Sequence, residues 1–496
     1  MREIEAKSGS SRTFLASHKA LYQTGKTSIR NAGSWLAVKW IVLGLLLLSI
    51  PVAIVWLRSA PKLAPWFWTL LTFLPFVLAP WQLTVSPYAT PFWSGYVKGW
   101  QFTALDAVAI AILFGHRGKW QRSYLILPFL FYASAVVVSI TQARFGALAS
   151  SYFVQLMRVF LVFLAVARIA MTDEGEKALL RGLVLGLCVQ AIYALLARSE
   201  GALQTGGSFG HQNLLGFVSH MALMPALALF LSGRSTKLGF AGVVAGVAIV
   251  ILTASRATIA FSAIGLVLTL VLCMVLRFSS RKLSVGAAAF VVLLACIPLA
   301  SASLERRFAV QNNSFFEEDR ERESFARAAR AMLAAKPLGV GPNHYVFIAN
   351  TEGYSEQAGV TWASGARSTN VHNSYLLIAA ESGYLGIVSF LILLGTALVY
   401  ALGSALRFRN RPGSEIFVGC GIGLLVVSLH GLYEWMFVVF PSQYLLAATL
   451  GLIAGLRSRY INLEVGRPKL QRTPILEAQA PMGPDTLPAG VGQGLS

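Results

Sequence analysis

One histidine stands where a long polar segment meets an apolar run, and its chemistry suits proton transfer. His372 follows the polar segment 304–371 and leads into the apolar run 374–402. Because an imidazole changes charge near neutral pH, it can take a proton from a hydroxyl group as a general base. A lone imidazole can equally serve structure by bonding a backbone carbonyl, so both interpretations of His372 stand.

A second polar group opens the apolar run 213–232. His211 and Asn213 lie there between Gly207 and Gly216. Glycine lets backbone N–H groups face a ligand, and the start of a helix favours phosphate oxygens. Asn213 could also be an ordinary helix cap. The segment therefore predicts either an anion site or a plain cap.

An arginine occupies the shortest turn between two strongly apolar runs. Arg256 lies between the runs 238–253 and 257–276. A guanidinium is planar, permanently charged and able to donate two hydrogen bonds in parallel, so it fits phosphate better than lysine does. The competing interpretation is that the side chain extends to lipid headgroups.

The polar segment 304–371 contains a stretch with helical periodicity. Its apolar residues recur at i, i+3, i+4 and i+7, as Phe325, Ala328, Ala329 and Met332. This spacing predicts an amphipathic helix whose apolar stripe lies on the membrane surface, with Arg320 and Arg322 on other faces. A solvated lid without chemistry is the alternative. Residues 337–343 cannot continue a helix, because prolines and glycines there demand a sharp turn.

Several ionisable residues lie inside apolar runs. They are Asp106, Arg158, His220, His430 and Glu434. Charge inside a bilayer costs free energy, so such groups are commonly functional or paired. His430 and Glu434, four residues apart, are expected to share one helical face. Arg158 and Glu434 are candidate ligands for a substrate, and mutual pairing is the structural alternative.

The composition places these residues in a membrane protein. Of the 496 residues, 56% are hydrophobic and 12% charged, and the mean hydropathy is +0.64. About thirteen stretches are long and apolar enough to span a bilayer. The net charge of +20 would suggest nucleic acid in a soluble protein, but the basic residues lie in short connections that orient helices, so we expect no nucleic-acid partner. All four cysteines lie in apolar runs, which leaves neither a disulfide framework nor a zinc spacing.

The apolar runs predict an all-α polytopic membrane protein with about twelve core transmembrane helices and one additional segment. The runs are 38–57, 64–81, 98–115, 123–140, 151–170, 178–197, 213–232, 238–253, 257–276, 284–303, 374–402, 415–437 and 441–457. Basic connections fall on one side, which is assigned to the cytoplasm, near 117–122, 177–181, 234–237, 277–282, 407–411 and 457–459. The connections assigned to the opposite side are 82–97, 198–212, 255–256 and 304–371.

The same pattern divides the chain into five parts. They are a basic N-terminal arm (1–36), a first transmembrane block (37–303), the long loop (304–371), C-terminal transmembrane helices (372–460) and a tail of disordered composition (461–496). We interpret the run 38–57 as a membrane anchor that is retained, not as a cleavable signal peptide. Its placement is ambiguous, because basic residues flank it at both ends and the charge pattern would assign both ends to the cytoplasm.

The polar groups together resemble the O-antigen ligase and polysaccharide polymerase superfamily of bacterial inner-membrane glycosyltransferases. The resemblance covers roughly residues 200–390. It rests on Gly207–Asn213, Thr253–Ala257, an arginine ahead of Pro337–Gly341, and His372–Tyr375 with Glu381–Gly386. Gln212 departs from the family pattern, since relatives often have proline there.

The resemblance implies an inverting, metal-independent and cofactor-free transfer of a glycan. The donor would be a glycan on undecaprenyl diphosphate, the acceptor hydroxyl would belong to a glycan, lipid A-core or protein, and transfer would occur at the periplasmic face of the inner membrane. Arg256 and Arg322 would hold the diphosphate, and His372 would activate or orient the acceptor hydroxyl. The spacing to Pro337 favours Arg322 over Arg320. The further substrate contacts expected are His211, Asn213, Arg320, Arg158, Asn373, Glu381 and Glu434.

The sequence alone leaves two questions about function open. The shared motifs do not separate a polymerase from a ligase, and the balance leans slightly to a polysaccharide polymerase. The competing class of function is a transporter or flippase for lipid-linked oligosaccharide. Such proteins commonly have repeated halves with charges at the bilayer midplane. The sequence has no internal repeat, and its polar groups collect at one predicted membrane face, which favours an enzyme.

Overall fold

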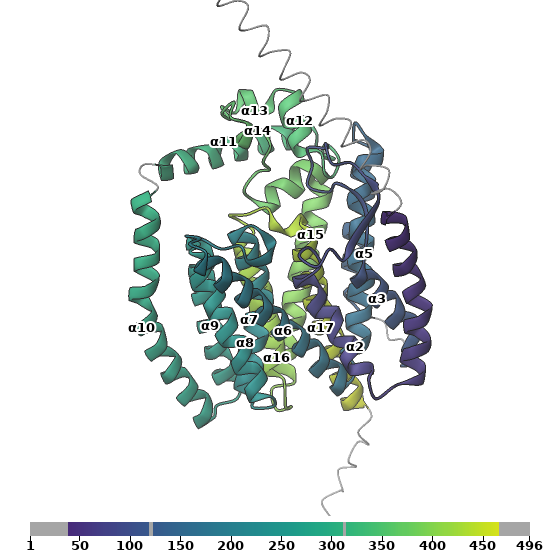
Figure 1. Ribbon diagram of the computed structural model, residues 1–496, viewed down its shortest axis with the longest axis vertical. Helices are drawn as coiled ribbons and strands as arrows, with labels where there is room; N and C mark the ends of the chain where they lie inside the picture. Colours follow the sequence, from purple (N-terminus) through teal and green to yellow (C-terminus); the bar gives the residue numbers. More distant parts are fainter. Residues whose placement is uncertain (1–37, 119–122, 311–313, 466–496) are drawn as a thin grey trace, which may run out of the picture.

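The computed structural model describes residues 38–118, 123–310 and 314–465, which form a helix bundle (Figure 1). A first helix covers Val38–Ser59. The first half of the bundle contains α2 (Ala64–Phe73), η1 (Leu74–Phe76), β1 (Thr84–Ala89), β2 (Gly99–Thr103), α3 (Ala104–Gly115), α4 (Ile126–Ile140), α5 (Gly146–Ile169), α6 (Asp173–Ser199), η2 (Gly207–Phe209), α7 (Gln212–Ser232), α8 (Thr236–Thr253) and α9 (Arg256–Leu276). The second half contains α10 (Ser280–Val310), α11 (Ser314–Ala335), α12 (Tyr345–Thr351), α13 (Tyr354–Gln357), α14 (Ser364–Arg367), α15 (Ser374–Arg407), α16 (Glu415–His430), η3 (Met436–Val438) and α17 (Phe440–Val465).

The predicted fold class, a helical membrane protein, is confirmed. Seven of the described helices are long and apolar enough to cross a membrane, judged by length and composition: Val38–Ser59, α5, α6, α7, α8, α9 and α15. Three shorter helices, α3, α4 and α16, are also apolar. The number of spans and the placement of the first segment stay predictions.

Four details of the sequence-based prediction are wrong. The run 98–115 opens with strand β2, which pairs antiparallel with β1, so the described fold is not purely helical. The run 415–437 stops being helical at His430. Helix α10 continues to Val310, past the expected loop start at 304. Helix α17 runs to Val465, past the expected start of the tail at 461, whereas the N-terminal arm and residues 466–496 lie outside the described residues.

The predicted amphipathic helix forms as α11 and lies across one end of the bundle (Figure 1). Its apolar stripe packs on protein rather than on a membrane surface, because α11 contacts α12, α13 and α15. Tyr345 of α12 donates a hydrogen bond to the carbonyl oxygen of Phe325 at 3.1 Å. The stripe is buried throughout, as Phe325, Ala328, Ala329 and Met332. This packing holds α11 against the start of α15.

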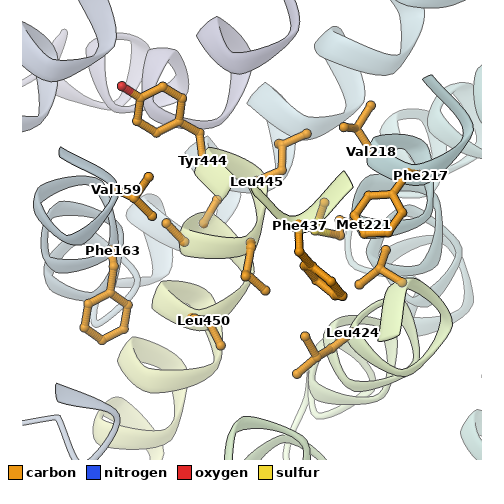
Figure 2. Packing of buried hydrophobic residues seen from close by; sticks show 14 of the residues in the cluster. Val159, Phe163, Phe217, Val218, Met221, Leu424, Phe437, Tyr444, Leu445 and Leu450 are labelled. Atoms are coloured by element: carbon orange, nitrogen blue, oxygen red, sulfur yellow. The ribbon is translucent and has the colours of Figure 1, made fainter. Parts of the chain in front are cut away.

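The core centres on α17, which packs between α5 and the pair of α7 and α16 (Figure 2). Lipid tails are as apolar as leucine, so close packing holds such helices together in a bilayer. Gly451 and Gly455, four residues apart on α17, allow this approach: a Cβ at Gly455 would lie 2.3 Å from the carbonyl oxygen of Ala167 in α5. The contact fixes α17 and with it the preceding turn.

Charged side chains pair at the end of the bundle opposite α11. Arg234 and Arg459 both bond the carboxylate of Glu176, and both bond Asp173, at 2.6 and 3.1 Å. Glu176 is buried, so its charge requires such partners. Arg234 and Arg459 belong to basic connections that the charge pattern assigns to one side. They lie together, but which side of a membrane they face stays a prediction.

A glycine joins α15 to the turn after α11. Gly383 interrupts the helical dihedral angles of α15 with φ of +68°, a region that residues with a side chain rarely adopt. At the kink, backbone groups of α15 are free to bond this turn. The N–H of Val340 donates to the carbonyl oxygen of Ala380, and the N–H of Tyr384 donates to that of Pro337, both at 3.0 Å. The turn predicted at 337–343 is therefore a docking point for α15.

Replacing Gly383 with alanine is expected to lower the thermal midpoint of the purified protein by several degrees. A Cβ there would lie 2.3 Å from the carbonyl oxygen of Pro337, and the backbone conformation, with φ of +68° and ψ of −171°, costs about 1–3 kcal/mol for a residue with a side chain. Gly395→Ala is the matched control, because the same helix leaves open space around that position. Equal thermal midpoints for the two variants would contradict the predicted strain.

Candidate active site

A buried carboxylate joins three helices at the end of the bundle that carries α11. Glu434 lies in the turn between α16 and η3 and is only 2% exposed. Its Oε1 accepts hydrogen bonds from Asn213 Nδ2 at 2.6 Å and Arg322 Nη2 at 3.5 Å. Its Oε2 lies 3.3 Å from His372 Nδ1. We call these four residues the Glu434 cluster.

Main-chain bonds fix the histidine beside this carboxylate. The backbone N–H of Ser374 donates to the carbonyl oxygens of Gly431 and Glu434, at 2.8 and 3.1 Å, and its hydroxyl donates to the latter at 2.6 Å. Asn373 caps α15, because its Oδ1 accepts from two backbone N–H groups of the first turn. The residue before this cap, His372, is thereby anchored to the turn that carries Glu434. The Oδ1 atom of Asn373 is therefore committed to the cap.

The start of α7 supplies the third side of the cluster. The ring of His211 is the helix cap and accepts from the backbone N–H of Asn213 at 3.3 Å. The side chain of Asn213 is therefore free to bond Glu434. Of the two interpretations that the sequence leaves open here, a plain cap by Asn213 is wrong. An anion at this helix start stays a prediction.

The two arginines of α11 have different positions. Arg322 reaches Glu434 and also donates to the carbonyl oxygen of Tyr433 at 3.2 Å, and its side chain is 36% exposed. Arg320 is exposed. Two residues along a helix correspond to a rotation of about 200°, so Arg320 faces away from the cluster. The geometry favours Arg322 as the arginine of this site, as the spacing to Pro337 does.

Arg256 lies at the same end of the bundle, at the first position of α9. The preceding residue, Ser255, caps the helix by accepting from the backbone N–H of Thr258 at 3.4 Å. Helices α7 and α9 touch here, since a Cβ at Gly216 would lie 1.9 Å from the hydroxyl oxygen of Thr258. Arg256 is exposed. Its joint action with Arg322 on one diphosphate stays a prediction.

The charges of the cluster define its state at neutral pH. Burial raises the pKa of the Glu434 carboxyl, but the hydrogen bond and charge of His372 and the charge of Arg322 outweigh burial and hold this pKa below its ordinary value. Burial lowers the pKa of His211; the charge of Glu434 opposes that shift, and His372 adds to it. Glu434 is therefore ionised, and His211 is neutral.

Two other predicted ligands lie in structural networks elsewhere. Arg158 donates to Asp106 at 2.8 Å and to the hydroxyl of Tyr444, with all three side chains buried. Glu381 accepts from the hydroxyl of Tyr96 at 2.6 Å and from a backbone N–H of α12 at 2.9 Å, and is 2% exposed. The structure brings neither residue to the Glu434 cluster, and it favours the pairing alternative for Arg158.

The expectation that His430 and Glu434 share a helical face is wrong. Helix α16 ends at His430, and Glu434 lies beyond it in the turn. The ring of His430 instead lies with its Nδ1 3.1 Å from Nε2 of His220, whose Nδ1 lies 3.2 Å from the hydroxyl of Ser262. This buried histidine pair lies next to the turn that carries Glu434.

The bonds that assemble the cluster were missed at the level of sequence. Each member was a candidate, but nothing linked Asn213 to Glu434, which lies 221 residues away. The anchoring of Ser374 to the turn 431–434 also has no local signal. Among the residues that the structure describes, no three His, Cys, Asp or Glu side chains are grouped to hold a metal ion.

The fold and the site define a polytopic helical membrane protein with a histidine–carboxylate pair and an arginine at one end of the bundle. Residues 241–391 match the protein family described as O-antigen ligase. The match confirms the predicted resemblance to the O-antigen ligase and polymerase superfamily over this segment. No curated protein matches the chain. The matched segment contains Arg256, Arg322 and His372, whereas Asn213 and Glu434 lie outside it.

Proposed function

We propose that this protein transfers a glycan from undecaprenyl diphosphate to an acceptor hydroxyl at the periplasmic face of the bacterial inner membrane. The pathway would be exopolysaccharide or lipopolysaccharide biosynthesis, with a lean to polysaccharide polymerase over a ligase for lipid A-core or protein. The observation that carries the proposal is the contact of His372 with buried Glu434 beside Arg322, inside a chain whose central segment matches the O-antigen ligase family. The membrane lipids would hold the donor's polyprenyl tail.

The proposed reaction is a single inverting displacement. The acceptor oxygen forms a bond to the anomeric carbon while the bond from that carbon to the diphosphate oxygen breaks. The acceptor proton passes to His372, which acts as general base. The bond electrons leave on the diphosphate, whose growing negative charge Arg256 and Arg322 would stabilise. Products are the extended glycan and undecaprenyl diphosphate.

The direct test is transfer in proteoliposomes that contain the purified full-length protein and undecaprenyl-diphosphate-linked glycan. We expect new glycosidic bonds and release of undecaprenyl diphosphate. A polymerase forms longer glycans from the donor alone, whereas a ligase requires a lipid A-core or protein acceptor. Movement of the lipid-linked glycan across the vesicle without new glycosidic bonds would indicate a transporter and overturn the proposal.

Metal removal should leave this activity unchanged. In the proposed reaction the guanidinium groups of Arg256 and Arg322 supply the positive charge that a divalent cation supplies in many transferases. The measurement is the initial transfer rate before and after dialysis against EDTA, with magnesium or manganese added back as a control. A rate that falls with EDTA and recovers with metal would contradict the metal-independent mechanism.

A further inference from the structure

We infer that Glu434 is the positioning residue of His372 and that it shares its carboxylate with Arg322, so that donor binding strengthens the base by drawing the guanidinium away. The inference rests on the proposed function. It concerns a residue outside the segment that matches the family, and it assigns Glu434 to His372 rather than to a substrate.

The first step is the state of the imidazole. A carboxylate can only accept hydrogen bonds, so the contact of 3.3 Å requires His372 to carry a proton on Nδ1. In the neutral ring the other nitrogen, Nε2, then has a free lone pair. Nε2 is therefore the atom that accepts the proton of the acceptor hydroxyl. Without the carboxylate, the ring could adopt the other tautomer, which offers a donor where an acceptor is needed.

The second step is the rigidity of the carboxylate. Asn213 donates to Glu434 at 2.6 Å, and Ser374 bonds its carbonyl oxygen. Glu434 is 2% exposed, while the side chain of His372 is 25% exposed. The arrangement places a fixed, buried anion behind a partly exposed base. Such a pair orients the ring and stabilises the imidazolium that forms during transfer.

The third step is the weak ion pair between Arg322 and Glu434. Charge-assisted N–H to carboxylate bonds are about 2.7–2.9 Å long, whereas Arg322 lies 3.5 Å from Glu434. A diphosphate offers more charge and parallel acceptors to the same guanidinium. When Arg322 moves to the donor, the charge of Glu434 is less compensated and favours the protonated ring of His372. Among the described residues, the charged or titratable groups that act on His372 or on its carboxylate include Glu434, Arg322 and His211, and the buried ring of His430 lies near Glu434.

Opposite shifts in the pH profile test this arrangement. In Glu434→Gln, the imidazolium loses its counter-charge, so the acid limb of kcat/KM should move to lower pH by about one unit. In Arg322→Gln, a repelling charge is lost, so the limb should move to higher pH. We also expect Glu434→Gln to lower kcat by about 10²- to 10⁴-fold with little change in KM for the donor. Both shifts should persist in a His211→Gln background, which removes the other titrating ring.

Controls separate this role from a structural one. Glu323→Gln, an exposed carboxylate on α11 that pairs with Arg330, should keep the wild-type profile. Glu434→Asp restores the charge and should return the acid limb toward the wild-type position. If Glu434→Gln fails to fold, Arg322→Gln carries the test, because its acid limb should still move to higher pH. A wild-type acid limb and kcat in a folded charge-neutral variant, or shifts of equal sign in the two variants, would overturn the inference. Failure of the proposed function is distinct, because then the wild-type protein itself forms no glycosidic bond.

Discussion

Alanine in place of His372 is expected to lower kcat of glycan transfer by about 10²- to 10⁴-fold, the usual contribution of a general base. The side chain contributes the only proton acceptor that the proposed reaction uses. The donor's KM should change little, because the ring acts on the acceptor hydroxyl as charge develops and does not hold the diphosphate. The measurement is the initial rate in proteoliposomes over a range of donor concentrations.

The loss should not reflect unfolding. The start of α15 is held by Ser374 and Asn373, which bond backbone groups and stay intact in His372→Ala. His116→Ala is the matched control, because this histidine lies at the far end of α3, against the ring of Trp68. It should keep its transfer rate. Near-normal kcat in a folded His372→Ala protein would refute the general-base role and leave His372 as a structural residue.

Much of the fold could be predicted because a bilayer imposes long apolar helices. The runs that became α5, α7, α8 and α9 differ from the observed helices by only a few residues at most of their ends. The errors lie where polar residues compete locally. Thr103 and Asp106 form a reciprocal cap that starts α3 six residues into the run 98–115, and the residues before it pair as a strand.

The residues of the site could be selected from sequence, but their partners could not. Arginines, histidines and glycines at helix ends have recognisable chemistry, which is why Arg322, His372 and Asn213 were candidates. Their bonds depend on how α7, α11 and the turn after α16 pack together, and no local pattern encodes such contacts. Arg158 shows why such partners matter: the sequence allowed either a substrate contact or a structural pair, and the pairing with Asp106, 52 residues away, appears only in the folded structure.

Removing either arginine that is proposed to bind the diphosphate should also slow transfer strongly. Arg256→Ala and Arg322→Ala are each expected to slow transfer roughly 100- to 1,000-fold, or about 2.7–4 kcal/mol, by analogy with loss of one donor to a developing oxyanion. In the proposed reaction the diphosphate leaving group gains negative charge as its bond breaks, so a positive charge near it lowers the barrier. Lysine at either position keeps the charge but loses the parallel pair of hydrogen bonds, so partial activity should remain.

Arg320→Ala is the matched control for Arg322→Ala. The two residues lie on the same helix, α11, carry the same charge and differ in the face they occupy, so Arg320→Ala should keep nearly the wild-type rate. If Arg256 and Arg322 bind one diphosphate, the double substitution should raise the activation free energy by less than the sum of the two single increases. The effects of groups that act as a unit are not additive. Full additivity would place the arginines on separate anions. A large loss in Arg320→Ala with a normal rate in Arg322→Ala would exchange their roles and remove the link between the donor and Glu434.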